Sequence, residues 1–363
     1  MNLPSLTLGD LVAKVPIIQG GMGVGVSRSG LASAVANEGG IGVISGVQIG
    51  FTEDDFKTNS LAANIRVLKR EIRKARELSP NGIIGVNLMV AMNHYKEMVM
   101  TAVEEKIDLI ISGAGLPKEL PDLVKGTNTK IAPIVSSGKA AHLITKLWEK
   151  RYNVLPDMVI VEGPEAGGHL GFSLEQLQQK AKISLAEIVS EVKEVMSSFE
   201  EKSKKYIPVI AAGGIFDGKD IAKYLSMGAA GVQMGTRFIA TEECDADTNY
   251  KQAFMQSKEE DIQLVKSPVG MPGRAIHNTF VQRTELDRVP VKRCYDCLTI
   301  CDPKTTPYCI SDALIEAVKG NLNDGLIFTG SNGHRLKEIV TVKQLMTELV
   351  EEAQSTLANK VTL

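Results

Sequence analysis

The sequence predicts an α/β protein built as a (β/α)8 TIM barrel, with a helical insertion after strand 6 and an irregular and helical C-terminal extension. Short apolar, β-branched runs alternate with amphipathic, helix-like stretches over the first 240 of the 363 residues. Such near-continuously apolar runs are typical of parallel strands that are covered on both faces. About eight of these units occur in ~225 residues, which fits a closed barrel. A doubly wound sheet is the alternative, because periodicity alone does not show closure.

Each expected strand is a short apolar run that ends in small residues. These runs lie at Pro16–Gln19, Ile41–Ser45, Ile83–Leu88, Leu109–Ser112, Ile131–Val135, Met158–Val161, Pro208–Ala212 and Gly231–Met234. The clearest helix-like stretches between them lie at Gly30–Asn37, Leu61–Leu78, His94–Glu105, Gly138–Lys150 and Gly218–Met227.

The connection after strand 6 is longer than the others. The chain from Gly171 to Tyr206 reads as two helices, and Ser184 is a candidate N-cap for the second. We therefore expect a helical insertion at about residues 172–206. This insertion is either a solvent-exposed helical segment without a further role, or a lid or a surface that binds a partner.

The βα pattern breaks after about residue 240, so residues 1–240 are interpreted as the barrel domain and 241–363 as a C-terminal extension. Residues 244–310 are interrupted by five prolines and are expected to be irregular. Two closing helices are expected, at Ser311–Lys319 and at Val342–Ala358, where apolar residues recur at helical spacing.

Composition excludes several classes of protein. The chain holds 41 Lys plus Arg against 43 Asp plus Glu, a net charge of −2. This balance argues against a nucleic-acid partner, because a protein that binds nucleic acid needs a basic surface to neutralise phosphates. No apolar run is long enough to span a bilayer, and no secretory signal is visible at the N-terminus. We expect a cytoplasmic protein with no membrane partner.

Four of the five cysteines lie within one short segment, residues 294–309. With no secretory signal, a disulfide scaffold is not expected. Four thiolates this close could hold one Zn²⁺ or an iron–sulfur cluster. The alternative is four reduced cysteines that pack as small apolar side chains. The candidate ligands are Cys294, Cys297, Cys301 and Cys309.

Glycine clusters follow several of the expected strands. In a parallel barrel the chemistry lies at the C-terminal ends of the strands, and the loops after strands 7 and 8 commonly hold a phosphate. Here those loops carry Gly213-Gly214 and Gly235-Thr236, whose backbone amides suit a phosphate monoester. The nearby run GGIFDGKD resembles a P-loop, but Asp220 stands where that motif needs a hydroxyl for Mg²⁺.

His169 is the candidate general base or acid. It follows Gly167-Gly168 at the end of strand 6, where a flexible turn would aim the imidazole at the barrel mouth. The neighbouring carboxylates Glu162 and Glu165 are expected to orient the ring or to raise its pKa.

The runs PIIQGGM, GVNLMV, EGPEAGGHLG, PVIAAGGI and GVQMGTRF resemble the nitronate monooxygenase family, formerly called the 2-nitropropane dioxygenases. That family includes the FMN-dependent type II enoyl-acyl-carrier-protein (enoyl-ACP) reductases. The resemblance covers about residues 10–280, and the order of EAGGH, AAGGI and QMGTRF is its most specific part. It implies a TIM-barrel flavoprotein that binds FMN without a covalent bond.

The resemblance also implies a role for particular residues. His169 matches the active-site histidine of the family, Gly20, Gly21 and Met22 would approach the flavin ring, and Asn87 would bond near it. The ribityl chain and phosphate would lie against the loops after strands 7 and 8. The residues expected at the cofactor are Gly20, Gly21, Met22, Asn87, Glu165, Gly168, Gly213, Gly214, Gln233, Gly235 and Thr236.

Three functions follow from these observations. The leading hypothesis is an FMN-dependent oxidoreductase that oxidises alkyl nitronates. The first alternative is an enoyl-ACP reductase II of fatty-acid synthesis, which would use NAD(P)H and take its substrate from acyl carrier protein. A non-redox barrel that binds a sugar phosphate is the alternative from another class. All three act on a small molecule, and homodimer formation is left open.

Overall fold

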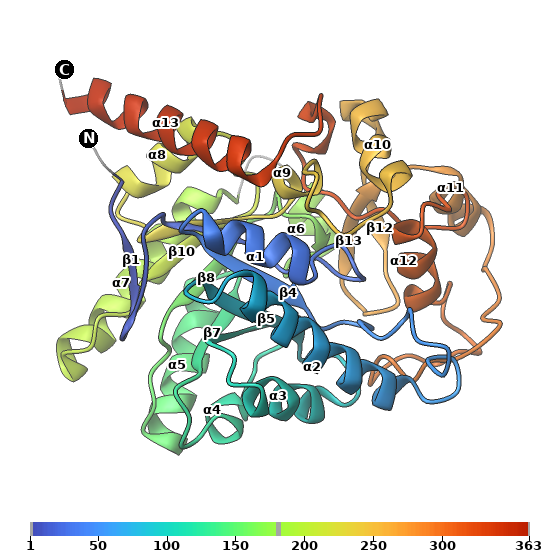
Figure 1. Ribbon diagram of the computed structural model, residues 1–363, viewed down its shortest axis with the longest axis horizontal. Coiled ribbons are helices and arrows are strands. Elements are labelled where there is room, and N and C mark those ends of the chain that lie inside the picture. The colour runs from blue at the N-terminus through green and yellow to red at the C-terminus, as the bar shows by residue number, and fades with distance from the viewer. Residues whose placement is uncertain (1–2, 179–182, 362–363) are drawn as a thin grey trace.

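The computed structural model describes residues 3–178 and 183–361. Its centre is a closed barrel of parallel strands in the order β10-β11-β3-β4-β5-β6-β7-β8 (Figure 1). The predicted TIM barrel is therefore confirmed, and each predicted strand lies within one residue of an observed one. The strands are β3 (Ile17–Gln19), β4 (Ile41–Ser45), β5 (Ile83–Met89), β6 (Leu109–Gly113), β7 (Lys130–Val135), β8 (Val159–Glu162), β10 (Val209–Ala212) and β11 (Gly231–Met234).

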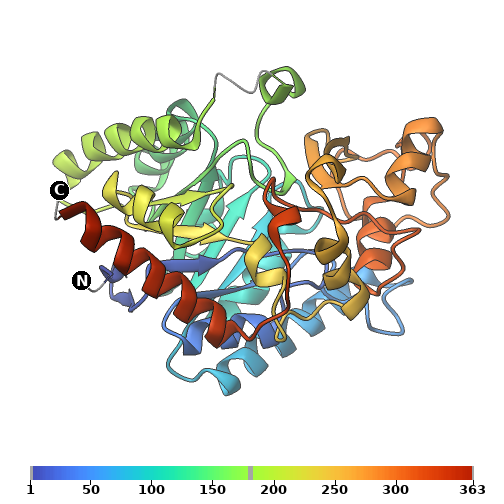
Figure 2. The same cartoon turned by 90° about the horizontal axis from the view of Figure 1, so that it is seen from above.

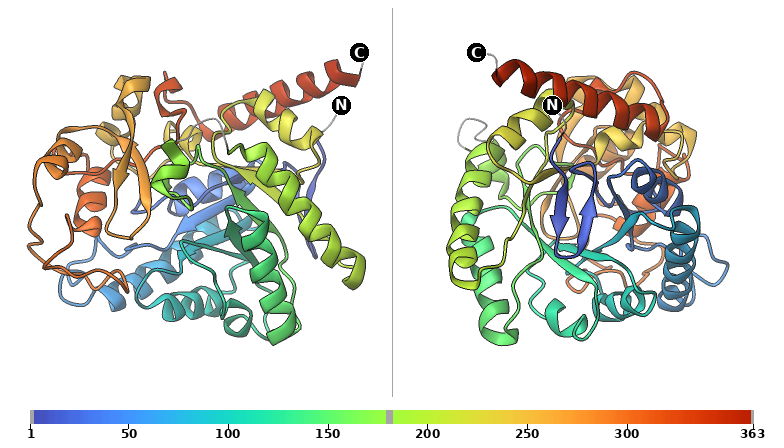
Figure 3. Two further views of the ribbon diagram at one scale, coloured as in Figure 1. Left: turned by 180° about the vertical axis from the view of Figure 1, so that it is seen from behind. Right: turned by 60° about the vertical axis from the view of Figure 1, so that its left-hand side comes forward.

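The interior of the barrel is closed at its N-terminal end by a hairpin. Strands β1 (Leu6–Leu8) and β2 (Leu11–Ala13) pair antiparallel, and Figure 3, right, shows this hairpin across the end of the barrel. Leu6 and Leu8 are fully buried with the inward-facing residues of the strands, such as Ile18 and Ile111. The hairpin leaves the opposite end, where the strands have their C-termini, for a ligand.

Helices surround the barrel at nearly the predicted positions. Most of the apolar core lies between this helical layer and the outer faces of the strands. The helices of the layer are α1 (Ser29–Asn37), α2 (Ser60–Leu78), α3 (Tyr95–Glu104), α4 (Leu120–Leu123), α5 (Gly138–Tyr152), α7 (Leu185–Ser203) and α8 (Gly218–Ser226).

The prediction of a helical insertion at 172–206 is largely wrong. Helix α7 packs against α5, β8 and β10 and buries Ile188, Val192 and Met196, so it is the regular barrel helix that follows strand β8. Ser184 caps it, as expected, within a reciprocal capping box with Glu187. Only α6 (Leu174–Gln178) is additional, and residues 179–182 lie outside the described residues.

The last helix of the barrel layer comes from the end of the chain. Helix α13 (Val342–Val361) lies along α8 and contacts α1, so it fills the position between the last and first βα units (Figure 1). The chain therefore leaves the barrel after α9 (Thr236–Ile239), forms the extension and returns. A division into two domains at residue 240 stays a prediction.

The extension is more regular than predicted. Residues 244–310, which were expected to be irregular, contain α10 (Thr248–Gln256), η1 (Glu259–Asp261), β12 (Ile262–Lys266), β13 (Pro272–Ile276) and α11 (Thr279–Leu286). The prolines fall in the connections or at the first residue of β13, where no ladder bond is lost. Helix α12 (Ile310–Val318) and the turn η2 (Gly333–Arg335) follow.

The extension gathers at one end of the barrel (Figure 2). Its strands β12 and β13 form a sheet with β9 (Gly168–His169), which belongs to the turn after β8. It has an apolar core of its own, in which Phe280, Tyr308 and Leu326 are buried. No helix of the described chain is long and apolar enough to cross a membrane.

Candidate active site

A cavity of about 390 Å³ lies at the C-terminal ends of the barrel strands, beneath the extension. The structure brings together in it all of the sequence-predicted cofactor residues and the predicted catalytic histidine. Its lining includes Gly20, Gly21, Met22, Asn87, Glu165, Gly168, His169, Gly213, Gly214, Gln233, Gly235 and Thr236. The extension adds a roof that the motifs did not indicate, formed by Met271, Leu314, Phe328, Thr329 and Gly330.

Two of the glycine turns are required by geometry. A Cβ at Gly21 would clash with the Cβ of Asn87, so the backbone after β3 lies directly against the side chain of β5. Gly213 and Gly214 have φ of +91° and +79°, which L side chains rarely adopt. This conformation turns the backbone after β10 around the end of the cavity and leaves it bare for a ligand.

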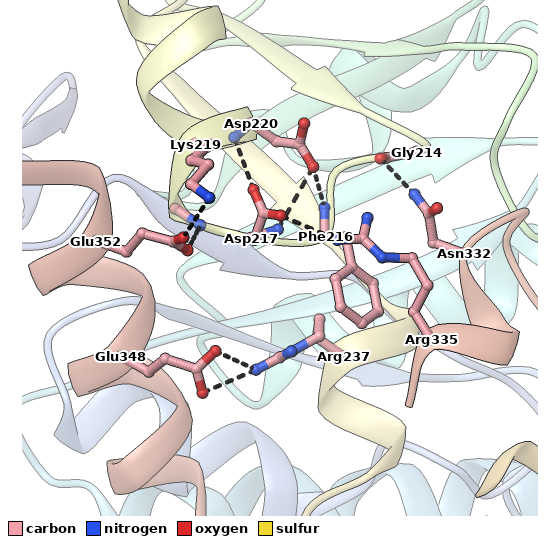
Figure 4. Close-up of polar contacts among 11 residues, drawn as sticks. Gly214, Phe216, Asp217, Lys219, Asp220, Arg237, Asn332, Arg335, Glu348 and Glu352 are labelled. Carbon is pink, nitrogen blue, oxygen red and sulfur yellow. Dashed lines mark hydrogen bonds and ion pairs between the residues drawn. The ribbon is translucent and has the colours of Figure 1, made fainter. Parts of the chain in front are cut away.

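A third segment completes the phosphate cradle predicted after β10 and β11. The segment Thr329–Gly333, called here the TGSNG segment, comes from the extension. The Gly330 amide donates to Thr236 Oγ1 at 3.2 Å, and Asn332 Nδ2 donates to the Gly214 carbonyl at 2.8 Å (Figure 4). This segment thus joins both phosphate loops. It was missed from the sequence, because it lies outside the motifs and most of its own amides bond within the protein.

The outer side of this cradle is held by charged side chains. Phe216 lies between two guanidinium groups, with Arg335 Cζ at 4.0 Å and Arg237 Cζ at 4.8 Å from the ring centroid. Arg335 pairs with Asp217 at 3.0 Å and Arg237 with Glu348 of α13 at 2.9 Å (Figure 4). The loop after β10 is therefore fixed to the end of the chain.

His169 is enclosed by the extension. Its backbone pairs with β13, its Nε2 lies 2.7 Å from Ser267 Oγ, and Phe328 meets its ring edge-on at a centroid distance of 5.0 Å. Burial lowers the pKa of His169 to about 4, so the imidazole is neutral at physiological pH. The expectation that carboxylates orient it or raise its pKa is wrong, because its polar partner is a hydroxyl and burial dominates.

Glu162 is a cavity residue that the sequence did not assign to the cofactor. It ends β8 and lines the cavity, and none of the other described side chains forms a hydrogen bond or ion pair with its carboxyl. Burial raises the pKa of Glu162 to about 8. At neutral pH the carboxyl is therefore protonated and can donate a hydrogen bond into the cavity.

The residues present fit FMN. In the predicted phosphate cradle, the amides of Gly213, Gly214 and Gly235 form no hydrogen bond within the described part of the chain and are available to a phosphate. Gln233 Oε1 is buried and has no partner within the described part of the chain, so it is an acceptor free for a ribityl hydroxyl. Asn87 lies against Gly21 and brings a side-chain amide to the cavity wall.

The predicted metal site is not formed. Cys294 is exposed, and Cys297, Cys301 and Cys309 are half-buried against the apolar core of the extension, all as free thiols. Across residues 3–178 and 183–361, which include all four, no group of three or more His, Cys, Asp or Glu side chains is arranged to hold a metal ion. Burial raises the pKa of Cys309 to about 12, so this thiol is protonated. The alternative of reduced, packed cysteines fits the structure.

The fold and the cavity together are those of a (β/α)8-barrel enzyme, with glycine turns that suit a phosphate and an enclosed, neutral histidine in one cavity. A model of the nitronate monooxygenase family matches residues 6–352. The chain belongs to this family, and membership makes it an FMN-dependent oxidoreductase.

Similar proteins agree with this assignment. A probable nitronate monooxygenase of Staphylococcus aureus strain N315 is 30% identical over 308 residues, which cover 75% of this chain and 78% of that protein. The structure of FabK from Thermotoga maritima has a TM-score of 0.74 and 26% identity, and covers 96% of this chain and 95% of its own. A nitroalkane oxidase from Streptomyces ansochromogenes, at 22% identity, shares the fold with a TM-score of 0.71 and covers 95% of this chain and 97% of its own.

Proposed function

We propose that this chain oxidises alkyl nitronates, the anions of nitroalkanes, with FMN as its cofactor. The observation that carries the proposal is the cavity itself. The glycine turns after β10 and β11, which suit a phosphate, and the neutral, enclosed His169 line the same cavity. Family membership and the probable nitronate monooxygenase of S. aureus support the choice of substrate.

The cofactor-binding residues are proposed as the sequence motifs indicate them. Gly213, Gly214, Gly235 and Thr236 would hold the phosphate, and the TGSNG segment would keep their two loops in place. Gly20, Gly21, Met22 and Asn87 would lie along the ring, and Glu165, Gly168 and Gln233 would complete the site. When bound, FMN supplies the acceptor for two electrons from the substrate.

His169 is proposed as the base of the reaction. A neutral imidazole can accept the acidic proton from the carbon next to a nitro group, and a pKa of about 4 keeps it neutral across the working range. The protonated Glu162 adds no negative charge to the cavity, so this carboxyl does not repel an anionic nitronate.

Enoyl-thioester reduction is the second candidate, and the similarity to FabK over 96% of the chain favours it. This function would require NAD(P)H as the reductant and acyl carrier protein as the partner. We retain a cytoplasmic location and a homodimer as further proposals. The sugar-phosphate barrel is not retained, because the family assignment makes the chain an oxidoreductase.

One anaerobic experiment separates the two candidates. The purified protein is expected to be yellow. Adding a nitronate should bleach the flavin absorbance without any nicotinamide, whereas enoyl reduction would require bleaching by NADH or NADPH followed by recovery on adding an enoyl thioester. A protein that is colourless and cannot be reconstituted with FMN would contradict both. His169→Ala should keep its flavin and lose about 10²–10⁴-fold in turnover of a neutral nitroalkane.

A further inference from the structure

Helix α13 carries two carboxylates that bond to two different phosphate loops. Glu348 and Glu352 are four residues apart in the sequence, which places them about one helical turn from each other on one face of the helix. Glu348 pairs at 2.9 Å with Arg237 of α9, which follows β11. Glu352 accepts a hydrogen bond at 2.8 Å from the amide of Gly218, where the loop after β10 ends (Figure 4). One face of α13 therefore connects the two loops.

The approach of α13 to the first residue of α8 is too close for a side chain at Gly218. A Cβ at this position would lie 2.5 Å from the amide nitrogen of Ala353 and 2.6 Å from the Cβ of Glu352. Leu349 and Ala353 are fully buried, and α13 packs along α8. The contact is therefore a packed interface, and the place of α13 determines the place of Gly218.

The glycine turn after β10 has little of its own to fix its position. In the part of the chain that the structure describes, the amides of Gly213 and Gly214 form no hydrogen bond, and the Gly214 carbonyl accepts one from Asn332. Glycine backbone is also the least restricted of all. The turn is therefore held by strand β10 before it and by α8 after it, and the first residue of α8 is the one that Glu352 bonds.

We propose that α13 holds the phosphate site in its binding geometry, with Glu348 and Glu352 as positioning residues that fix the loops after β11 and β10 for the phosphate of FMN. Neither carboxylate lines the cavity, so both act through the loops. The inference rests on the proposed placement of the phosphate, but it is independent of the substrate. Because linkage between two binding events is reciprocal, bound FMN should in turn stabilise the docking of α13.

Electrostatics alone predicts the opposite role for these carboxylates. A phosphate monoester carries about −1.5 to −2 charges at neutral pH, and like charges repel. Removing Glu352 would then tighten FMN binding, and so would removing Glu348, because it leaves the Arg237 cation unpaired. A role in holding the loops predicts that either removal weakens FMN binding. The sign of the change therefore separates the two roles.

Riboflavin separates a role at the phosphate from a role in general stability, because riboflavin is FMN without the phosphate. Fluorescence titration of the full chain, freed of flavin, gives the affinity for each. The wild type should bind FMN more tightly than riboflavin. Glu352→Ala should weaken FMN binding about threefold to tenfold, the range expected for one lost hydrogen bond, and leave riboflavin binding unchanged. Glu348→Ala should act in the same direction.

Three further variants isolate the cause of this loss. Gly218→Ala changes no charge but places a Cβ against α13, so it should also weaken FMN binding and not riboflavin binding. Glu352→Gln keeps an acceptor oxygen for the Gly218 amide and should restore the affinity for FMN. Glu351→Ala is the matched control, because it removes the neighbouring, exposed carboxylate of the same helix, and it should leave the affinity for both flavins unchanged.

Hydrogen exchange tests the reciprocal effect in the wild type and needs no variant. With each flavin at saturation, FMN should slow amide exchange in α13 more than riboflavin does. Equal protection by the two flavins would overturn the proposal. So would equal losses of FMN and riboflavin affinity in Glu352→Ala, or an FMN affinity that is unchanged or higher.

The outcome is distinct from that of the proposed function. If the wild type binds FMN and riboflavin equally, the phosphate is not held by these loops, and the inference fails together with that placement. If the protein prefers FMN but oxidises no nitronate, the proposed substrate fails. The binding and exchange results then still decide whether α13 positions the phosphate loops.

Discussion

The buried carboxyl of Glu162 should make the stability of this protein depend on pH, and Glu162→Gln should remove that dependence. Glutamine has the shape and the neutrality of the protonated acid. The pKa of the Glu162 carboxyl is 4.5 in an unfolded chain and is raised to about 8 by burial in the folded protein. Protonation therefore favours the folded state. The stability is fully present below pH 4.5 and is lost as the pH rises through 8.

The magnitude follows from the linkage of protonation to folding. One pKa unit corresponds to ~1.4 kcal/mol, so the rise from pH 4.5 to 7 would cost the wild type ~3.5 kcal/mol if the carboxyl were wholly shielded. The carboxyl lines a cavity that water enters, which reduces the penalty. We expect Glu162→Gln to exceed the wild type by ~2 kcal/mol in free energy of unfolding at pH 7 and by nearly nothing at pH 4.5.

Urea unfolding of flavin-free protein at pH 4.5, 6, 7 and 8 measures this difference without a contribution from the ligand. Glu175→Gln is the control, because Glu175 is an exposed carboxylate of the same connection and should show no pH-dependent gain. A stabilisation by Glu162→Gln that is the same at every pH would mean that the amide gains a contact. Equal stability of the two proteins at pH 7 and 8 would show that Glu162 is ionised and well solvated, and would refute the argument.

Three further outcomes are expected. Gly235→Asp should abolish flavin retention, measured by absorbance after gel filtration, because it places a carboxylate in the phosphate cradle. Gly235→Ala is the control and should retain flavin, because its Cβ would lie at an ordinary contact distance of 3.4 Å from Met22 Sδ. Asn332→Ala should weaken FMN binding about threefold to tenfold, as judged by fluorescence titration, because one neutral hydrogen bond to Gly214 is lost. In a thiol titration without denaturant, the exposed Cys294 should react first and Cys244 should react last. Cys244 is only 4% exposed, and burial raises the pKa of its thiol to about 11. Simultaneous reaction of both thiols would contradict the burial of Cys244.

The barrel strands were predictable because each is buried on both faces. A strand such as Ile41–Ser45, in which every residue is buried, leaves an uninterrupted apolar run in the sequence. The glycine turns were equally visible, since the approach of Gly21 to Asn87 tolerates no side chain. These signals are local, and each of them marks the C-terminal end of a strand.

The error over helix α7 has a physical cause. Its exposed face carries many charges, and the connection is lengthened by α6, so the stretch resembles an added surface segment. The apolar residues Val189, Val192 and Met196 lie on the other face and cover strands β8 and β10. The helical spacing of the apolar residues indicates that one face of the helix packs against the barrel, whereas the number of charged residues describes only the face toward solvent.

The rest of the site depends on contacts between distant parts of the chain. Ser267 reaches His169 across 98 residues and Asn332 reaches Gly214 across 118, and neither stands in a motif. For the cysteine segment the sequence suggested a contact that the fold does not make. The close spacing of the four cysteines suggested a shared metal ion, but three of the thiols pack against an apolar core. The spacing of residues along the sequence limits the distance between them, but the packing of the folded chain determines where their side chains point.

The extension contributes directly to the position of His169. Arg274 of β13 holds the turn before His169 by donating to the carbonyls of Pro164 and Ala166 at 2.8 and 2.5 Å. The same strand pairs with Gly168. A base must be held in one geometry to act, and that is the role we propose for His169. The barrel supplies the glycine turn, and Arg274, more than a hundred positions later, holds it, which ties the position of His169 to the folding of the extension.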